Sequence, residues 1–578
     1  MTAVMTPMTV ENCFIRPKRV VERLKAYTPP LEGRRNKIRL DFNENTVGFP
    51  AVWPSPWDVT LMTTYPEYGD FSLRLARQLQ IHPETLLLTN GSDEALNVIA
   101  STFTEPAEDA ALISKPSFPL IGHYLRLADA NVVEVMATSE FEYDLPALDS
   151  ALQQQRYKMA IFASPDNPTG ALMPVQQVLR WCQQYPETLF VMDEAYSAYV
   201  SADQTVLPYV ATTPNLMVTR TFSKAWGLAG LRLGYVVAHP QLVDYMKRVR
   251  SPYSVNTVAV HAANQLLERE SEVVSEALAT MERKTHLVQA VRSRGYRVYE
   301  GHANFFLMAA GVHTGALEDA CLQEQVLVRD RSTAPGLQGL VRVSVGTEPE
   351  NQAFIKALDR FKQSQALIFD LDDTLVDTRQ SFDAVVMALV ARYSATPLTL
   401  DELTALRAEG GFNDDWQATV ELLHRRGVSV SYAAIAEEAE ALYHQKARAV
   451  ERLLLDPELL RQWASRYRLF ILTGRSRSEY EPVWAERLDA LFEAVYCADD
   501  FPGMSRKPAP DMLNSLMIRH QIEGGCYIGN SVDDMRAAKA AGLFAVGIAY
   551  THPADILQQA GADAVLDTVA DVWSLFDR

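Results

Sequence analysis

The sequence predicts an α/β protein with several domains, and three observations support this prediction. Short apolar runs that end in a carboxylate occur in both halves, at Leu189–Met192 before Asp193 and at Ala366–Phe369 before Asp370. Such runs are typical of parallel strands that are covered on both faces. Residues from about 378 to 460 show helical periodicity instead. The chain has 578 residues, and at about 150 residues per domain this length suggests about four units.

The composition restricts the class of partner. A net charge of −18 disfavours nucleic acid and anionic membranes as partners. The five cysteines are scattered and form no CxxC pair, which fits a reducing cytoplasm and argues against a disulfide framework or a zinc site. No apolar run approaches the roughly 18 residues of a membrane span, and the first residues lack the pattern of a signal peptide. We therefore expect a cytoplasmic protein that acts on small molecules.

The stretch Thr219–Tyr235 contains a candidate cofactor-binding lysine. Lys224 follows Ser223, and Arg232 comes eight residues after the lysine. A lysine amine can form a Schiff base with the aldehyde of pyridoxal phosphate. Hydroxyl and guanidinium groups nearby can hold the cofactor phosphate. Most lysines are solvated surface charges, so this stretch alone leaves both interpretations open.

A second candidate phosphate site lies earlier in the chain. The apolar run Leu86–Leu88 is followed by Gly91, Ser92 and Asp93, where a helical pattern begins. Free N–H groups at a helix start bind anions, although Ser92 or Asp93 could simply cap the helix. Phe118, after another strand-like run, could stack on a flat cofactor ring or lie in the core.

Two polar residues at strand ends fit the same cofactor. Asn167 lies in a Pro-rich turn after an apolar strand, and its amide could contact the phenolic oxygen of the cofactor. Asp193 ends a buried strand, where α/β sheets bind ligands, and its carboxylate could pair with a pyridine N–H. A helix cap is the alternative for Asp193. The order of Asn167, Asp193 and Lys224 favours the cofactor site.

Residues from about 20 to 360 resemble fold-type I aminotransferases, most closely the histidinol-phosphate aminotransferases. The motifs that carry the resemblance are NEN, YPE, GSDE, DNPTG, DEAY, TFSKAWGLAGLR, LVRD and VRVSVGT. The resemblance implies a large and a small domain over residues 1–362, pyridoxal 5'-phosphate, a homodimer, and histidinol phosphate with glutamate or 2-oxoglutarate as substrates. It implies Lys224 as the Schiff-base lysine. The cofactor site that it implies consists of Tyr65 from a second subunit, Ser92, Asp93, Phe118, Asn167, Asp193, Tyr196, Ser223 and Arg232. Phe118 departs from the family, which usually has a tyrosine there.

The resemblance also implies a substrate site. Arg342 would bind a carboxylate, and Tyr27 and Arg329 would bind the substrate phosphate. Both arginines follow alternating apolar residues, as on strands. Strand arginines are usually solvated edge charges, whereas the functional alternative is a bidentate clamp on an anion.

The second half contains a pair of carboxylates spaced for phosphoryl chemistry. In ALIFDLDDT, Asp370 ends a strand and Asp372 follows two residues later, so both side chains point the same way in extended backbone. One can attack as a nucleophile while the other works as acid and base. Thr473 and Lys507, near two further motifs, could stabilise a phosphoryl group, and the carboxylates imply Mg²⁺. An acidic capped turn is the alternative.

The aminotransferase pattern stops around residues 361–365, FKQSQ, where we expect a short polar linker between the two halves. Residues from about 366 to 578 resemble the phosphatase branch of the haloacid dehalogenase superfamily. The resemblance implies a Rossmann-like core, a helical cap at about 378–460, and metal ligation by Asp370, Asp372, Asn530 and Asp534. The fourth motif reads GNSVDD instead of GDxxxD, so Asn530 replaces an acidic ligand. This departure leaves open a binding or regulatory module without activity. Residues Gly410–Trp416 are a candidate lid loop for the leaving group, or an ordinary turn between helices.

Together the two halves predict a bifunctional enzyme of histidine synthesis. The first would transfer an amino group between glutamate and imidazole-acetol phosphate, and the second would hydrolyse the resulting histidinol phosphate. The alternatives are a threonine-phosphate decarboxylase-like first half and a general phosphatase for small metabolites as the second half.

Overall fold

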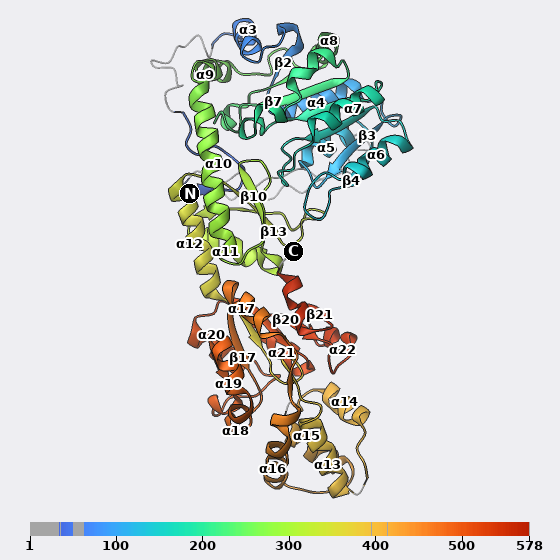
Figure 1. Ribbon diagram of the computed structural model, residues 1–578, viewed down its shortest axis with the longest axis vertical. Coiled ribbons are helices and arrows are strands. Elements are labelled where there is room, and N and C mark those ends of the chain that lie inside the picture. The colour runs from blue at the N-terminus through green and yellow to red at the C-terminus, as the bar shows by residue number, and fades with distance from the viewer. Residues whose placement is uncertain (1–33, 35, 50–62, 395, 413, 577–578) are drawn as a thin grey trace, which may run out of the picture.

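The computed structural model describes residue 34 and residues 36–49, 63–394, 396–412 and 414–576. Tyr27, which the sequence assigns to the substrate phosphate, lies outside these residues. The aminotransferase-like part and the hydrolase-like part lie end to end, and helix α12 (Glu348–Ser364) runs from one to the other (Figure 1). Both parts are α/β, as the sequence predicts.

The larger domain of the first part is a seven-stranded sheet with helices on both faces. Its strand order is β2-β8-β7-β6-β5-β3-β4, and only β8 runs antiparallel to its neighbours. The strands are β2 (Leu86–Thr89), β3 (Ala110–Lys115), β4 (Asn131–Met136), β5 (Met159–Ala163), β6 (Leu189–Asp193), β7 (Leu216–Thr221) and β8 (Gly234–Val237). Strands β5 and β6 are buried throughout, which explains why they appear in the sequence as continuous apolar runs.

The helices of this domain pack on the sheet through two separate apolar clusters. One face carries α4 (Gly91–Phe103), α5 (Pro119–Leu127) and α8 (Pro240–Val249). The other face carries α3 (Gly69–Gln78), α6 (Leu145–Gln154), α7 (Val175–Gln184) and α9 (Thr257–Leu267). Because both faces are covered, polar groups reach solvent mainly at the strand ends, where the predicted site residues lie.

A smaller antiparallel sheet forms the second domain of this part. Its order is β12-β13-β10-β9, with β9 (Val298–Tyr299), β10 (Phe305–Ala309), β12 (Arg329–Asp330) and β13 (Leu340–Ser344). Helices α10 (Glu270–Arg292), α11 (Thr314–Gln323) and α12 pack beside it. The predicted strand positions of Arg329 and Arg342 are confirmed, and the two residues are directly paired across β12 and β13.

The second part has a six-stranded parallel sheet with the order β18-β17-β14-β19-β20-β21. Its strands are β14 (Gln365–Phe369), β17 (Arg468–Leu472), β18 (Ala494–Tyr496), β19 (Gly524–Gly529), β20 (Phe544–Ile548) and β21 (Ala564–Leu566). A helical cap follows β14 and consists of α13 (Phe382–Ser394), α14 (Leu400–Glu409), α15 (Asp415–Arg425) and α16 (Tyr432–Val450). The short strands β15 (Val376–Asp377) and β16 (Arg452–Leu453) pair where the cap leaves and rejoins the core. The cap lies at the end of the molecule farthest from the seven-stranded sheet (Figure 1).

The junction between the two parts differs from the short polar linker expected at residues 361–365. Helix α12 continues to Ser364, and β14 begins at Gln365, so no linker separates them. The buried guanidinium of Arg466 donates hydrogen bonds to the carbonyl oxygens of Phe576 (2.8 Å) and Ala309 (3.0 Å). The ring of Phe576 stacks on His313 of the first part with centroids 5.2 Å apart. Phe576, at the end of the described chain, therefore contacts both parts and stabilises their junction.

No helix among the described residues is long and apolar enough to span a membrane.

Candidate active sites

Nine residues predicted for the first site line one cavity of about 120 Å³. They come from the ends of neighbouring strands and from the start of α4. They are Ser92, Asp93, Phe118, Asn167, Asp193, Tyr196, Ser223, Lys224 and Arg232.

One end of this cavity is built to receive an anion. Helix α4 starts at Gly91 with φ +75°, and a Cβ atom there would lie only 2.7 Å from Nη2 of Arg232. Arg232 itself has φ +57°, donates to Asp93 Oδ2 at 2.9 Å and lies 3.3 Å from Ser223 Oγ. The alternative that Ser92 or Asp93 caps α4 is wrong, because the N-cap is Asn90 and no side chain caps the helix. The glycine thus lets the guanidinium approach the free N–H groups of the helix.

Asp193 lies deeper in the same cavity. It is 4% exposed, and Thr219 Oγ1 donates to its Oδ1 at 2.8 Å. Burial raises the pKa of Asp193 to about 7, because this environment supplies too little positive charge for a buried carboxylate. A protonated ring nitrogen would supply that charge. The phosphate-binding end and this carboxylate therefore fit pyridoxal phosphate.

Lys224 faces the cavity from the turn after β7. Its Nζ donates to the carbonyl oxygen of Phe42 at 3.1 Å and lies 5.5 Å from the ring centroid of Tyr196. The Tyr196 hydroxyl accepts a hydrogen bond from Nδ2 of Asn43 at 3.0 Å. Asn43 is buried and has φ +55°, and it was missed as a site residue although it belongs to the NEN motif. Asn43 therefore orients the hydroxyl of the tyrosine whose ring lies beside the lysine.

The two predicted substrate arginines lie next to this cavity. Arg342 is buried and donates to Asn167 Oδ1 and to the carbonyl oxygen of Asp41. Arg329 lies directly opposite Arg342 on the neighbouring strand, with its Cζ 5.7 Å from the ring centroid of Phe42. Like charges at directly opposed positions destabilise a sheet. An anionic ligand at this edge would relieve the repulsion.

Tyr65 lies outside the cavity. Its side chain is 72% exposed and stacks on Tyr253, with centroids 4.3 Å apart. Its predicted contact with the cofactor of a second subunit stays a prediction.

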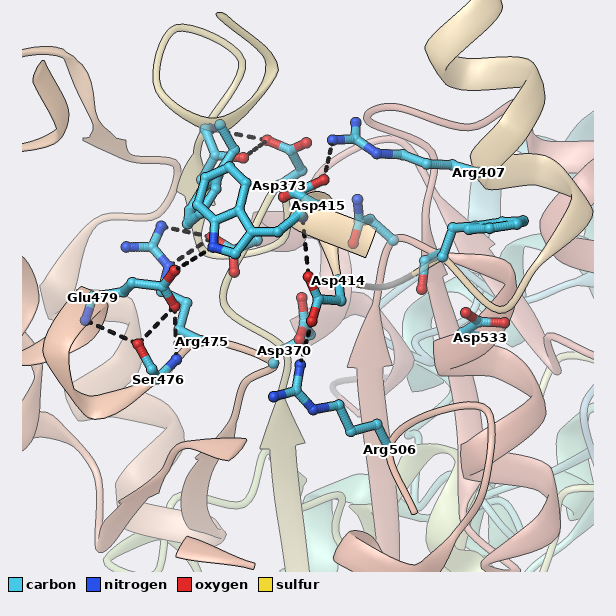
Figure 2. A pocket seen from close by; sticks show the side chains of 18 of the residues that line it. Asp370, Asp373, Arg407, Asp414, Asp415, Arg475, Ser476, Glu479, Arg506 and Asp533 are labelled. Carbon is cyan, nitrogen blue, oxygen red and sulfur yellow. Dashed lines mark hydrogen bonds and ion pairs between the residues drawn. The ribbon is translucent and has the colours of Figure 1, made fainter. Parts of the chain in front are cut away.

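The second site is a cavity of about 280 Å³ between the cap and the parallel sheet (Figure 2). Asp370, Asp372 and Asn530 line it, whereas Thr473, Lys507 and Asp534 lie behind its wall. Lys507 is buried and donates to Asp370 Oδ1 at 2.6 Å and to Asp534 Oδ1 at 2.7 Å. Thr473 Oγ1 lies 3.5 Å from Asp372 Oδ2. The predicted residues are thus brought together, with the two carboxylates of the DxD pair in the cavity.

The environment of Asp370 suits a buried nucleophile. Burial raises the pKa of this carboxyl, and the ammonium of Lys507 opposes that effect. Because Lys507 occupies Oδ1, the other oxygen has no hydrogen bond from a described residue. Asp370 Oδ2 is therefore the oxygen available to attack a phosphorus atom.

The side-chain oxygen atoms of this cavity are suitable ligands for Mg²⁺. Because Asn530 is neutral, they carry one negative charge fewer than the usual GDxxxD pattern would supply. Carboxylate and amide oxygens are the ligands that Mg²⁺ prefers, and Asp370, Asp372 and Asn530 supply them. Asp534 is 1% exposed and is held by Lys507 and by Ser531, whose Oγ donates to Asp534 Oδ2 at 2.7 Å. In the described part of the chain, no three His, Cys, Asp or Glu side chains are grouped to hold a metal. The ligand role of Asp534 stays a prediction.

We expect Asn530→Asp to tighten Mg²⁺ binding. The Asn530 amide bridges Thr374 Oγ1 (3.3 Å) and Thr551 Oγ1 (2.8 Å), and a carboxylate could accept hydrogen bonds from both hydroxyls. The added charge should lower the Kd for Mg²⁺ by roughly tenfold or more, since ligand charge tunes divalent-ion affinity over orders of magnitude. Titration calorimetry without substrate measures this. The exposed Asn514 supplies the control Asn514→Asp, and equal affinity in both variants would contradict the expectation.

Arg475 holds Asp372, the predicted acid–base carboxylate, and Glu451 in turn holds Arg475, and the sequence analysis missed both residues. Arg475 is buried and contacts Asp372 Oδ1 through Nε (2.8 Å) and Nη2 (2.6 Å). The same guanidinium binds both oxygens of Glu451, each at 3.1 Å. Glu451 follows the last cap helix, so Arg475 connects the cap to Asp372. Arg475 could have been found, because it belongs to the TGR sequence that follows an apolar strand. No pattern in the sequence pointed to Glu451.

The candidate lid loop does line the second cavity. Phe412, Asp414, Asp415 and Trp416 all contribute to its wall. The backbone N–H of Gly411 donates to Asp533 at 2.8 Å, and Trp416 Nε1 donates to Glu479 at 3.2 Å. The loop thus contacts the core beside Asn530, and its role in reading a leaving group stays a hypothesis.

Comparison with known proteins assigns a family to each part. Residues 37–358 match the family "Aminotransferase class I and II", and residues 364–542 match "haloacid dehalogenase-like hydrolase". A histidinol-phosphate aminotransferase of Caldanaerobacter subterraneus subsp. tengcongensis is 30% identical over 334 residues, which are 56% of this chain and 92% of the relative.

Solved structures resemble the first part as well. A histidinol-phosphate aminotransferase from Sinorhizobium meliloti in complex with pyridoxal-5'-phosphate has a TM-score of 0.54 and 24% identity, covering 60% of this chain and 98% of that one. L-threonine-O-3-phosphate decarboxylase from Porphyromonas gingivalis has a TM-score of 0.50 and 25% identity, covering 56% and 98%. With Lys224, Asp193 and the DxD pair in place, the chain belongs to the pyridoxal-phosphate-dependent class I and II aminotransferases and carries a haloacid dehalogenase-like hydrolase domain.

Proposed function

We propose that the chain catalyses two successive steps of histidine synthesis. The first part would transfer an amino group from glutamate to imidazole-acetol phosphate, giving histidinol phosphate and 2-oxoglutarate. The second part would hydrolyse histidinol phosphate to histidinol and phosphate. The observation that carries the first step is the direct pairing of Arg329 with Arg342 beside the Lys224 cavity, since it favours substrates with carboxylate or phosphate groups. The product of one site is the substrate of the other, which supports the second step.

The residues of the first site support amino transfer as follows. The chemistry supplied by bound pyridoxal phosphate is electron withdrawal from the substrate carbon that bears the amino group. Asp193 would hold the ring nitrogen, and Arg232 with Ser223 would hold the phosphate. Arg342 would orient the substrate carboxylate. Lys224 Nζ, held beside Tyr196, would move the proton of that carbon.

The residues of the second site support phosphate hydrolysis. Asp370 Oδ2 would attack phosphorus while Asp372 gives a proton to the leaving oxygen. The chemistry supplied by bound Mg²⁺ is neutralisation of charge on the phosphoryl oxygens. Lys507 keeps Asp370 oriented through its 2.6 Å contact. Asp372 then accepts a proton from the water that cleaves the phosphoenzyme.

The proposed pairing is tested by incubating the full chain with pyridoxal phosphate, histidinol phosphate and 2-oxoglutarate, with and without Mg²⁺. We expect glutamate in both samples and a strong dependence of phosphate release on Mg²⁺. A parallel sample with threonine O-3-phosphate tests the decarboxylase alternative, which the Porphyromonas gingivalis structure favours. Release of carbon dioxide there, without glutamate formation from histidinol phosphate, would contradict the proposal. We also propose a homodimer, in which Tyr65 completes the cofactor site of the partner subunit.

We expect Arg329→Ala to weaken recognition of the substrate phosphate. The side chain donates no hydrogen bond to another described residue, so its removal should cost the fold little. A hydrogen bond to a charged group is worth about 1.5–3 kcal/mol, which corresponds to a rise of roughly 10- to 100-fold in KM for histidinol phosphate. Steady-state kinetics on histidinol phosphate and on glutamate measure the effect. Arg156→Ala, at a residue with a 74% exposed side chain, is the control. An equal rise in KM for both substrates would contradict a phosphate-specific role.

A further inference from the structure

The hydrolase cavity contains one carboxylate that the mechanism does not use and that has neither a hydrogen-bond donor nor an ion-pair partner among the described residues. Glu440 lies on cap helix α16 and lines the cavity. No hydrogen bond or ion pair joins its side chain to any other described residue. It therefore lines, from the cap, the space that a substrate would occupy.

The positively charged side chains that line the cavity form ion pairs with carboxylates other than Glu440. Arg407 pairs with Asp383 (2.8 Å) and Asp415 (2.6 Å). Arg475 pairs with Asp372, and Arg506 pairs with Asp414 at 2.9 Å. None of the three arginines that line the cavity is thus left for Glu440.

Other carboxyl groups of the cavity differ from Glu440 because they have donors. Asp373 accepts hydrogen bonds from the backbone N–H and the hydroxyl of Thr378. Glu479 accepts hydrogen bonds from the Ser476 hydroxyl and from the indole of Trp416. These hydrogen bonds suit a structural role. Glu440 has a carboxylate group to which no described residue donates a hydrogen bond.

Aromatic rings of the cap line the cavity together with Glu440. They are those of Phe382, Phe412, Trp416 and Tyr432. Aromatic faces and a carboxylate together bind an ammonium group through cation–π and ionic contacts. A phosphate group bound at Asp370 would direct its leaving alcohol toward these cap residues, since the cap and the core form opposite walls of the cavity (Figure 2).

We propose that Glu440 determines specificity in the hydrolase site by binding a positively charged group on the leaving alcohol, so that the preferred substrates are phosphate monoesters of amino alcohols. This inference rests on the proposed phosphatase function and refines it. Histidinol phosphate is such an ester, because its ammonium group lies on the carbon next to the one that carries the phosphate. Esters without a cation would leave Glu440 desolvated and unpaired, which disfavours their binding.

The test compares matched substrates on the full chain with Mg²⁺. O-Phosphoethanolamine and 2-hydroxyethyl phosphate differ only in having an ammonium or a hydroxyl group. Histidinol phosphate and its N-acetyl derivative differ in the same charge. We expect the wild type to favour the cationic member of each pair roughly tenfold or more in kcat/KM, with the difference mainly in KM because binding of the remote charge is uniform through the reaction.

The variant Glu440→Gln should reduce that preference roughly tenfold, close to equality. Glu437→Gln is the matched control, since Glu437 lies three residues earlier on the same helix, is exposed and does not line the cavity. It should keep the wild-type preference. A wild type without preference, or a preference that survives in Glu440→Gln, would overturn the proposal. Discrimination between the two smaller esters without hydrolysis of histidinol phosphate would refute the proposed pathway role and uphold the role of Glu440.

Discussion

Lys224→Ala is expected to abolish amino transfer and leave phosphate release unchanged. Lys224 is the lysine of the first cavity, where Asp193, Tyr196 and Arg232 converge. Its amine would hold the cofactor and move the proton, and an alanine can do neither. The rate of glutamate formation should fall by about 10⁴-fold, the upper end of what one acid–base group contributes. The hydrolase site has its own sheet and its own residues, so its rate should not change.

The variant also has a spectroscopic readout. With added pyridoxal phosphate, the wild type should show an absorbance band that borohydride removes, and Lys224→Ala should show none. Lys247→Ala, which changes an exposed lysine on α8, is the control and should behave as the wild type does. A borohydride-sensitive band of wild-type intensity in Lys224→Ala would mean that another lysine holds the cofactor.

Strand-end residues were predictable because a simple rule places them. Asp193 and Asp370 each follow an apolar run, and in a parallel sheet the carboxyl ends of such strands meet at one edge. The order of motifs then pointed to Lys224, which lies in the same cavity as Asp193. The same rule could not find Asn43, which reaches Tyr196 from a segment far away in the sequence through a left-handed backbone conformation.

The contacts that a side chain makes were less predictable from the sequence than the chemical type of the residue. The acidic character of Asp534 suggests a metal ligand, but the sequence does not reveal that Ser531 and Lys507 contact both of its oxygens. The polar residues near 361–365 suggested a linker for a similar reason. Helix α12 instead continues to Ser364, and both Ser364 and Gln365 are buried. The ammonium of Lys362 donates to the carbonyl oxygen of Ser465 in the hydrolase-like part. A polar run therefore does not by itself indicate an exposed linker.

The cap was predictable as a set of helices but not as a contributor to catalysis. Its helical periodicity reports only which faces are buried. The contact between Glu451 and Arg475 depends on how the cap rejoins the core through β15 and β16, which no local pattern encodes. Because Arg475 also binds Asp372, the carboxylate predicted to work as acid and base is oriented partly by a residue that follows the cap.

Asp370→Asn is expected to stop phosphate release while amino transfer continues. An asparagine has nearly the same shape, and its amide oxygen can still accept a hydrogen bond from Lys507, so the hydrolase-like core should stay folded. The amide oxygen is a poor nucleophile, and the loss of a nucleophile should lower the rate of phosphate release from histidinol phosphate by about 10⁴-fold or more. Glutamate formation, followed in the same sample, should stay at the wild-type rate.

The control for this variant is Asp555→Asn, which removes an exposed carboxylate from α22 in the same part of the chain. It should release phosphate as the wild type does. If Asp370→Asn hydrolysed histidinol phosphate as fast as the wild type, the DxD pair would not be the reaction centre, and the alternative of a non-catalytic binding module would gain support. Loss of phosphate release with intact amino transfer would instead place the two reactions at separate centres, because the residues of the Lys224 cavity are unchanged in this variant.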